Sequence, residues 1–192
     1  MLFGNAPIST TRLLQIVTSQ VPGRAKSESR RDWTEAAKQV LCGLAKKCRL
    51  TPYASIHLGS EKHEEWLLDI VWHSVSGGTK LAVESEWGKL EHVQDDFEKL
   101  MSIKSPLKLM LFKSGNTRLS TAEVVQTLQG DLAPFKQNVK GETYLLVDFR
   151  GGEHQCYKFR VPHNGKLKAK EVRFSHLKRL SGPDVTRRRS PA

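Results

Sequence analysis

Three carboxylates that could act together occur within a short stretch of the chain, at Asp69, Glu84 and Glu86. Asp69 lies in an apolar run between Leu68 and Ile70, where an unpaired carboxylate is costly to bury. Glu84 and Glu86 are two residues apart, so in a strand both side chains project from the same face. Oxygen ligands in this pattern suit a hard divalent cation, and Mg²⁺ or Mn²⁺ is the expected cofactor. Such an ion polarises a phosphate and lowers the pKa of a bound water, which is chemistry for phosphodiester hydrolysis.

Two predicted strands joined by a turn would bring these acids together. Residues 65–73 and 80–87 are rich in apolar, aromatic and β-branched side chains, and the Ser-Gly-Gly-Thr sequence at 76–79 is typical of a turn. Alternation in the second strand puts Ala82, Glu84 and Glu86 on one face and Val83 and Ser85 on the other. If the hairpin pairs near its turn, Asp69 comes within reach of Glu84.

The elements around this hairpin alternate between helix and strand. A helix is predicted over residues 30–48, where apolar side chains recur at helical spacing and Ser29 or Asp32 can cap the start. After the hairpin, Val93, Phe97 and Leu100 predict a helix that ends before residue 106. The further elements expected are a strand at 107–112, a capping-box helix from 120 to about 129, and strands at 144–149 and 155–161. This order predicts an α/β fold with a mixed sheet flanked by helices.

Charge is unevenly distributed along the 192 residues, whose net charge is +11. Residues 61–98 hold ten acids and three bases, so this segment carries −7 and the rest of the chain carries +18. A basic surface attracts polyanions through the release of counterions. An acidic segment in a basic protein is the distribution expected of a metal-dependent enzyme that acts on nucleic acid, although solvated surface charges are an equal alternative.

Several other classes of function lack their signatures. The three cysteines form no CxxC pair, and their odd number argues against a disulfide framework, so an intracellular, reducing location is expected. The apolar runs are too short to cross a bilayer, and no membrane partner is expected. The seven histidines show no zinc-binding spacing, and no GxxxxGK[ST], GxGxxG or GxSxG motif occurs.

The hairpin pattern resembles the PD-(D/E)XK, or restriction-endonuclease-like, nuclease superfamily, over roughly residues 30–113. The core of that family runs helix, strand, strand, strand, helix, strand. Its signature is an Asp on one hairpin strand and (Asp/Glu)-x-Lys on the next. Asp69 matches the lone Asp and Glu84 matches the first position of the second element. Leu68 stands where the motif has Pro, and Glu86 replaces the motif Lys, a change that some active members share.

The resemblance implies roles for individual residues. Asp69 and Glu84 would bind the metal, and Glu86 would act as general base on the attacking water or bind a second ion. Lys99 is a candidate for a relocated lysine, because the family can move this charge onto the following helix, although its helical position lies away from the apolar stripe. Glu35 could add a ligand, as the family sometimes does, but its position opposite the apolar face favours a solvated side chain.

The leading hypothesis is therefore a Mg²⁺-dependent nuclease that acts on nucleic acid, with DNA expected. One alternative is a catalytically inactive nucleic-acid-binding module on the same fold, and another is a protein-interaction module whose acidic segment meets a basic partner. The structural alternative for the three acids is an exposed edge strand, with the carboxylates paired to Lys80 or Lys89.

Three segments are expected along the chain. Residues 1–28 form an N-terminal lead-in or a loosely packed first helix, residues 29–165 form the nuclease-like domain, and residues 166–192 form a basic C-terminal extension. Between residues 158 and 189 there are eleven bases and two acids, so this end is either a solvated terminus or an anchor for phosphates. An enzyme that cuts both strands of a duplex is often a dimer, so a homodimer is one possible oligomeric state.

Overall fold

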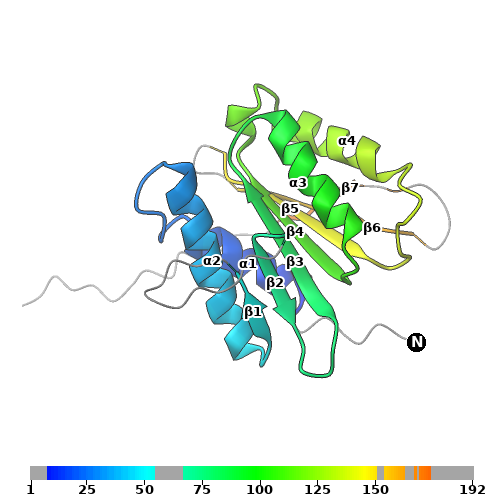
Figure 1. Cartoon of the computed structure of the whole chain (residues 1–192). Coiled ribbons are helices and arrows are strands. Elements are labelled where there is room, and N and C mark those ends of the chain that lie inside the picture. Colours follow the sequence, from blue (N-terminus) through cyan, green and yellow to red (C-terminus); the bar gives the residue numbers. More distant parts are fainter. Residues whose placement is uncertain (1–7, 55–66, 151–153, 163–166, 168, 174–192) are drawn as a thin grey trace, which may run out of the picture.

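The protein is a three-layer α/β structure in which one mixed sheet lies between two pairs of helices (Figure 1). This computed structural model describes residues 8–54, 67–150, 154–162, 167 and 169–173. The strands are β1 (Thr51–Tyr53), β2 (Ile70–His73), β3 (Thr79–Glu86), β4 (Leu107–Phe112), β5 (Thr143–Asp148), β6 (Gln155–Arg160) and β7 (Ala169–Glu171).

The strands lie in the sheet in the same order as in the sequence, from β1 to β7. The three central strands β3, β4 and β5 are parallel, whereas the outer pairs on each side are antiparallel. Parallel neighbours need a crossover connection. Helix α3 (Leu90–Ser102) makes this connection between β3 and β4, and helix α4 (Thr121–Leu132) makes it between β4 and β5.

Each face of the sheet has its own apolar core. Helices α1 (Thr10–Gln20) and α2 (Arg30–Lys47) cover one face, where Leu81, Val83 and Leu109 belong to their core. Helices α3 and α4 cover the other face, where Ala82 and Met110 belong to the second core. Successive residues of β3 and β4 therefore enter opposite cores, as the pleat of a strand requires. In Figure 1, α3 and α4 lie in front of the strands and α1 behind them.

Local capping fixes where the helices next to the site begin. The Ser29 side chain accepts a hydrogen bond from the Asp32 backbone N–H at the start of α2, and Ser120 and Glu123 form a capping box at the start of α4. Lys46 and Lys47 lie in the last turn of α2, where cations favour the helix dipole. These features confirm the helix starts predicted from the sequence.

The predicted α/β class and mixed sheet are confirmed, with three local differences. Asp69 does not lie inside a strand, because residues 67–69 form a bend and β2 begins at Ile70; residues 65 and 66 lie outside the described part. The short strands β1 and β7 were not predicted. Helix α1 is not loosely packed, since Leu13, Leu14 and Val17 have no exposed surface.

Candidate functional site

Two hydrogen bonds hold Asp69 against Glu84 and Ser85 of β3. Asp69 precedes the first residue of β2, and Glu84 follows Val83, the partner of Ile70 in β3. The Asp69 backbone N–H donates to Glu84 Oε2 at 3.2 Å, and the Ser85 backbone N–H donates to Asp69 Oδ2 at 2.9 Å. The predicted proximity of Asp69 and Glu84 is therefore confirmed, and it results from the bend at residues 67–69 that leads into β2.

The carboxylate of Asp69 is held from the α2 side of the sheet. Ser85 Oγ donates to Asp69 Oδ2 at 2.6 Å, and Lys38 Nζ on α2 lies 3.9 Å from Asp69 Oδ1. Lys38 is almost fully buried, with 6% of its surface exposed. Burying an ammonium group is costly unless it meets an opposite charge. Lys38 is thus a positively charged neighbour of the site that the sequence reasoning missed.

A signal for Lys38 was present in the sequence. It shares one helical face with Thr34, Leu41 and Ala45, which lie four residues before and three and seven residues after it. Leu41 and Ala45 are fully buried, so a lysine in this row points toward the core. A buried lysine on the helix that precedes a carboxylate-bearing hairpin would have indicated a partner acid.

Glu84 is a buried carboxylate with incomplete hydrogen bonding. Only 3% of its surface is exposed, and its Oε1 atom accepts no hydrogen bond from the described residues. Burial is the main cause that raises the pKa of Glu84 to about 8, and the negative charges of Asp69 and Asp96 raise it further. The backbone N–H of Asp69 and the charge of Lys99 oppose this rise. When it is ionised, this carboxylate therefore has a negative charge that Lys99 offsets only in part.

Lys99 reaches the site from α3, as the resemblance implies. Its Nζ atom lies 3.9 Å from Glu84 Oε1 and donates to Asp96 Oδ1 at 2.7 Å. The hydrogen bond to Asp96 is the main cause that raises the pKa of Lys99, and the charge of Glu84 adds to it. Lys99 is about two-fifths exposed, so its ammonium is charged and open to solvent at the edge of the site.

Glu86 occupies a separate position at the end of β3. Its Oε1 atom lies 3.9 Å from Arg30 NH1 on α2 and 4.0 Å from His92 Nδ1 on α3. This oxygen is buried and accepts no hydrogen bond within the described part of the chain. A Cβ added to Gly88 would collide with the same oxygen, so the glycine leaves room for this carboxylate. The position that carries Lys in the family motif is thus an acid with two basic neighbours.

A polar and aromatic network supports the Ser85 face of β3. Thr34 Oγ1 on α2 lies 3.3 Å from Ser85 Oγ and accepts a hydrogen bond from Trp87 Nε1 at 2.9 Å. The Trp87 ring packs against Trp33, with centroids 5.3 Å apart. Trp87 is buried, with 3% of its surface exposed, so it acts as a packing residue. The network fixes α2, and with it Lys38, against the end of β3.

The other acids and bases named from the sequence lie elsewhere. The cations next to the three acids in the described residues are Lys38, Lys99 and Arg30, rather than the predicted alternatives Lys80 or Lys89. Strand β2 is not an edge strand, since β1 covers it. Glu35 is half-buried and lines a different hollow, next to Arg24 and Arg31. No group of three or more His, Cys, Asp or Glu side chains gathers as a metal-ligand set in the described ranges.

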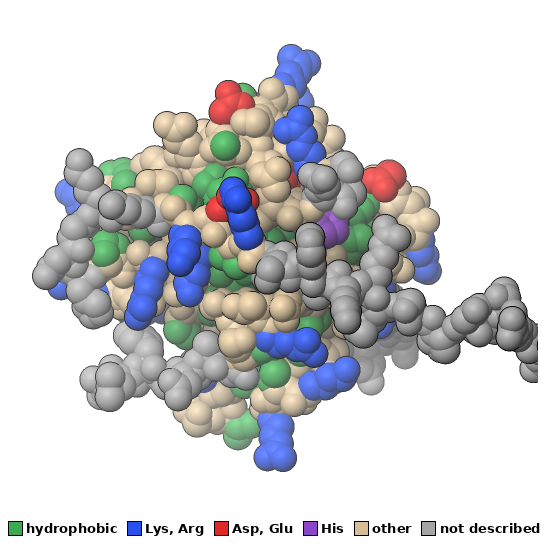
Figure 2. All heavy atoms as spheres, turned by 180° about the vertical axis from the view of Figure 1, so that it is seen from behind, with side chains coloured by type: hydrophobic (Ala, Val, Ile, Leu, Met, Phe, Trp, Pro, Cys, Tyr) green, Lys and Arg blue, Asp and Glu red, His purple; other side chains and the backbone are tan. Residues whose placement is uncertain are grey.

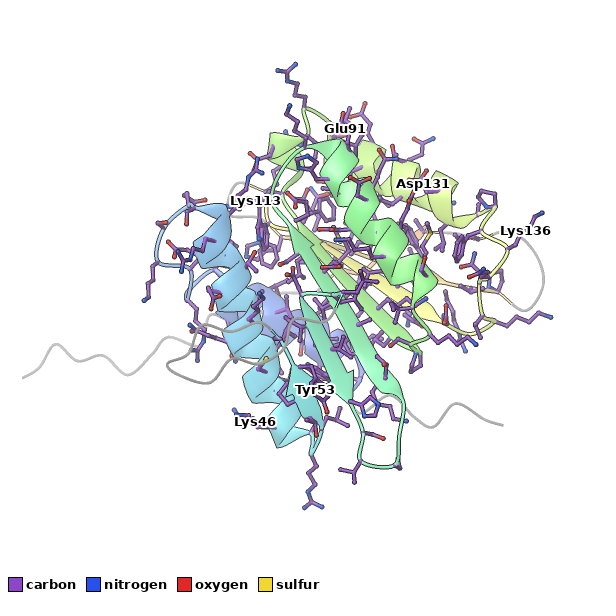
Figure 3. The ribbon with its side chains drawn as sticks, viewed as in Figure 1. Lys46, Tyr53, Glu91, Lys113, Asp131 and Lys136 are labelled. Carbon is purple, nitrogen blue, oxygen red and sulfur yellow. The ribbon has the colours of Figure 1, made fainter. Side chains whose placement is uncertain are left out.

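A cleft opens beside the site at the carboxyl ends of β4 and β5. It has a volume of about 680 Å³, and its lining includes Trp33, Lys113, Asn116, Phe149 and Arg150. The Asn116 side chain donates to the Trp87 backbone carbonyl at 2.6 Å, which joins the cleft to the end of β3. Figure 3 shows Lys113 between α2 and the strand ends, and its Nζ atom lies 3.8 Å from the centre of the Trp33 ring. Ligands commonly bind at this end of parallel strands.

No protein-family model matches this chain, and no curated protein matches its sequence. Within the described residues, every helix is too short or too polar to cross a bilayer.

Proposed function

We propose that this protein is a metal-dependent nuclease that hydrolyses phosphodiester bonds of nucleic acid, with DNA as the expected substrate. Asp69 and Glu84 would hold one Mg²⁺ or Mn²⁺ ion. The observation that carries the proposal is the pair of hydrogen bonds between the bend at Asp69 and β3. The Asp69 backbone N–H donates to the Glu84 carboxylate and the Ser85 backbone N–H donates to the Asp69 carboxylate, while Glu84 Oε1 accepts no hydrogen bond from the described residues.

Two carboxylates are enough for the expected metal. Mg²⁺ binds proteins through one or two carboxylates and takes its remaining oxygens from water and substrate phosphate. The orphaned Glu84 oxygen fits this ligand set, because a cation beside it would relieve the charge that burial and Asp69 impose. When bound, the ion would supply Lewis acidity and a water of lowered pKa.

The lysines on both sides of the carboxylates have distinct roles in this proposal. Lys38 is buried beside Asp69, so it holds that carboxylate in place. Lys99 is partly exposed beside Glu84, so its ammonium can contact a phosphate oxygen and stabilise negative charge that develops during cleavage. Lys99 would thus take the part of the lysine that the family motif has at the position of Glu86.

The arrangement of elements supports a restriction-endonuclease-like fold. From α2 to β4 the chain runs helix, strand, strand, strand, helix, strand, which is the core order of that family. Glu84 lies in β3, and Asp69 lies in the bend directly before β2, the strand that pairs with β3 in antiparallel fashion. The cleft at the carboxyl ends of β4 and β5 offers room for a phosphate backbone, and Arg150 in its lining adds positive charge, whereas Lys113 there is paired with Glu28 at 2.6 Å.

Cleavage of supercoiled plasmid and of single-stranded DNA with Mg²⁺, Mn²⁺ or EDTA tests the proposal. We expect nicking with either ion and none with EDTA. Asp69→Asn and Glu84→Gln should each lower the rate at least about 100-fold, because each removes one of two metal ligands. Asp95→Asn and Glu98→Gln remove the same charges from exposed positions on α3 and should retain the wild-type rate.

A nucleic-acid-binding module is the second candidate, favoured by one specific observation. The Glu86 carboxylate lies next to Arg30, His92 and Gly88, and this acid replaces the motif lysine. Tight DNA binding with no cleavage in Mg²⁺ or Mn²⁺ would establish this second candidate and reject the first.

A further inference from the structure

A basic groove lies on the α1 side of the sheet, at the edge opposite β1. It has a volume of about 570 Å³ and is lined by the first turn of α1 and by β6, β7 and the residues after β7. Its basic residues are Lys158, Arg160, Lys170 and Arg173, and its single acid is Glu171. Figure 2 shows lysine and arginine side chains gathered on this face.

The register of β6 and β7 places like charges directly opposite each other. Lys158 pairs with Lys170 across the antiparallel strands, so their side chains lie next to each other on one face. Arg160 is two residues from Lys158 and projects from that same face. Like charges at directly opposed positions destabilise a sheet. Lys158, Lys170 and Arg160 form no ion pair with the described residues, so their repulsion stays uncompensated there.

The rest of the groove adds positive potential. Glu171 is already bound to Arg173, with 2.9 Å between Arg173 NH2 and Glu171 Oε2, so this acid does not neutralise the opposed lysines. Thr10 and Thr11 form the first turn of α1, which contains no acidic residue. The backbone N–H groups at a helix start favour anions. The groove therefore combines three unneutralised cations with a positive helix end.

We propose that this groove binds consecutive phosphates of a nucleic acid strand and forms a second contact surface, apart from the candidate metal site. The inference rests on the proposed function for its choice of polyanion. Lys158 is aligned through Leu145 and Leu109 with Val83, three strands away, which corresponds to roughly 14 Å across the sheet. Lys158 shares its face with the α1 core residue Cys156, whereas Glu84 contacts α3 on the other face. The phosphates in the groove therefore belong to a different segment from those at Glu84.

Binding of fluorescein-labelled 30-base-pair duplex and 30-nucleotide single-stranded DNA, measured by anisotropy in EDTA over a range of salt, tests the groove without cleavage. The triple variant Lys158→Gln, Arg160→Gln and Lys170→Gln should weaken binding at least about tenfold and lower the salt slope by about 3. The matched control is Lys104→Gln, Lys136→Gln and Lys140→Gln, which removes three exposed charges near the α3 and α4 ends. The control should change the affinity less than about threefold.

The melting temperature of the groove variant shows whether a loss of DNA binding comes from misfolding. The groove variant should melt at the same or a higher temperature at low salt, because it removes the repulsion between Lys158 and Lys170. Equal losses of affinity in the groove and control variants would overturn the proposal, as would binding of poly-glutamate as tight as that of DNA. Failure of the nuclease proposal would give a different result. DNA binding would still depend on the groove residues, but neither Mg²⁺ nor Mn²⁺ would support cleavage.

Discussion

At the scale of single residues, the site depends on how burial and charge compete at Glu84. Its carboxylate lies next to Asp69 and Asp96, and the Lys99 ammonium is 3.9 Å from the carboxylate oxygen that accepts no hydrogen bond from the described residues. In water these charges would be well solvated, but Glu84 is buried. The folded protein therefore favours the protonated form of Glu84 unless a cation is added.

This conflict predicts a pH-dependent stability in the absence of metal. The folded-state pKa of Glu84 is raised from 4.5 to about 8, so its stabilising contribution is complete below pH 4.5 and is lost as the pH rises toward 8. Glu84→Gln imitates the protonated acid, so in EDTA it should melt above the wild type at pH 8 and close to it at pH 5. Thermal unfolding measured by circular dichroism checks this, with Glu98→Gln as the control. A Glu84→Gln protein that is less stable at both pH values would contradict it.

Gly88 gives a way to move Glu86 without changing its charge. A methyl group at residue 88 would collide with Glu86 Oε1 and crowd Arg30 NH1 at 2.9 Å and His92 Nδ1 at 3.1 Å. Gly88→Ala should therefore displace Glu86 and lower the stability by about 1 kcal/mol, with a smaller loss in a Glu86→Ala background. Chemical unfolding of the four proteins in this cycle measures the coupling. Gly115→Ala, where a methyl group would meet nothing within 4 Å, should leave the stability nearly unchanged.

The sequence predicted the acids of the site better than its bases. Asp69 and Glu84 could be recognised because carboxylates in apolar, alternating runs are unusual. Lys38 was missed because a lysine on a helix is normally solvated, and its burial depends on how α2 packs against β3. The different surroundings of Glu86 and Glu84 could not be predicted either. Alternation places both on one face of the strand, whereas the contacts of Glu86 come from the packing of α2 and α3.

At the scale of elements, a second buried charge pair joins β4 to the start of β5. Lys108 Nζ donates to Glu142 Oε2 at 2.8 Å and to the Tyr144 hydroxyl at 2.9 Å, and Lys108 and Tyr144 have only 1% of their surface exposed. Burial lowers the pKa of Lys108, whereas Glu142 raises it. This pair lies at the opposite end of β4 from the candidate site, so it has a structural role.

Removing one partner of this pair should be costly. Glu142→Ala leaves the Lys108 ammonium buried without its counter-charge and should destabilise the protein by about 3–5 kcal/mol. Lys108→Met combined with Glu142→Ala should recover part of the loss, because no unpaired charge remains. Urea unfolding monitored by tryptophan fluorescence provides the free energies. Equal destabilisation by the single and the double variant would show that the charge pair is not the cause.

Helices and strands were predicted correctly where their apolar pattern extends over many residues and were missed where it extends over only a few. Helices α2 and α4 and strands β4, β5 and β6 were located within a few residues, because their apolar patterns extend over six residues or more and end at caps or turns. Strands β1 and β7 contain three residues each, too few for alternation to appear, and they exist because β2 and β6 offer them a partner. The bend at Asp69 was missed because its apolar neighbours continue the strand pattern.

At the scale of the whole molecule, the uneven charge seen in the sequence becomes a spatial arrangement. The acids of the β2–β3 hairpin lie between α2 and α3. The groove formed by α1, β6 and β7 holds Lys158, Arg160 and Lys170, which form no ion pair with the described residues. The order of the strands in the sheet keeps the two regions apart, because β3 is the third strand from one edge and β7 forms the other edge. Most of the predicted basic C-terminal extension at residues 166–192 lies outside the described residues. Electrostatic attraction by such a surface should make DNA binding strongly dependent on salt.

The central claim is that Asp69 and Glu84 share one divalent ion, and Mn²⁺ binding tests it most directly. Free Mn²⁺ can be titrated by electron paramagnetic resonance against the wild-type protein at pH 8, without nucleic acid. We predict one site per chain that is lost in Asp69→Asn and in Glu84→Gln and retained in Asp95→Asn. A wild-type protein that binds no Mn²⁺, or a Glu84→Gln protein that binds it with unchanged affinity, would contradict the account.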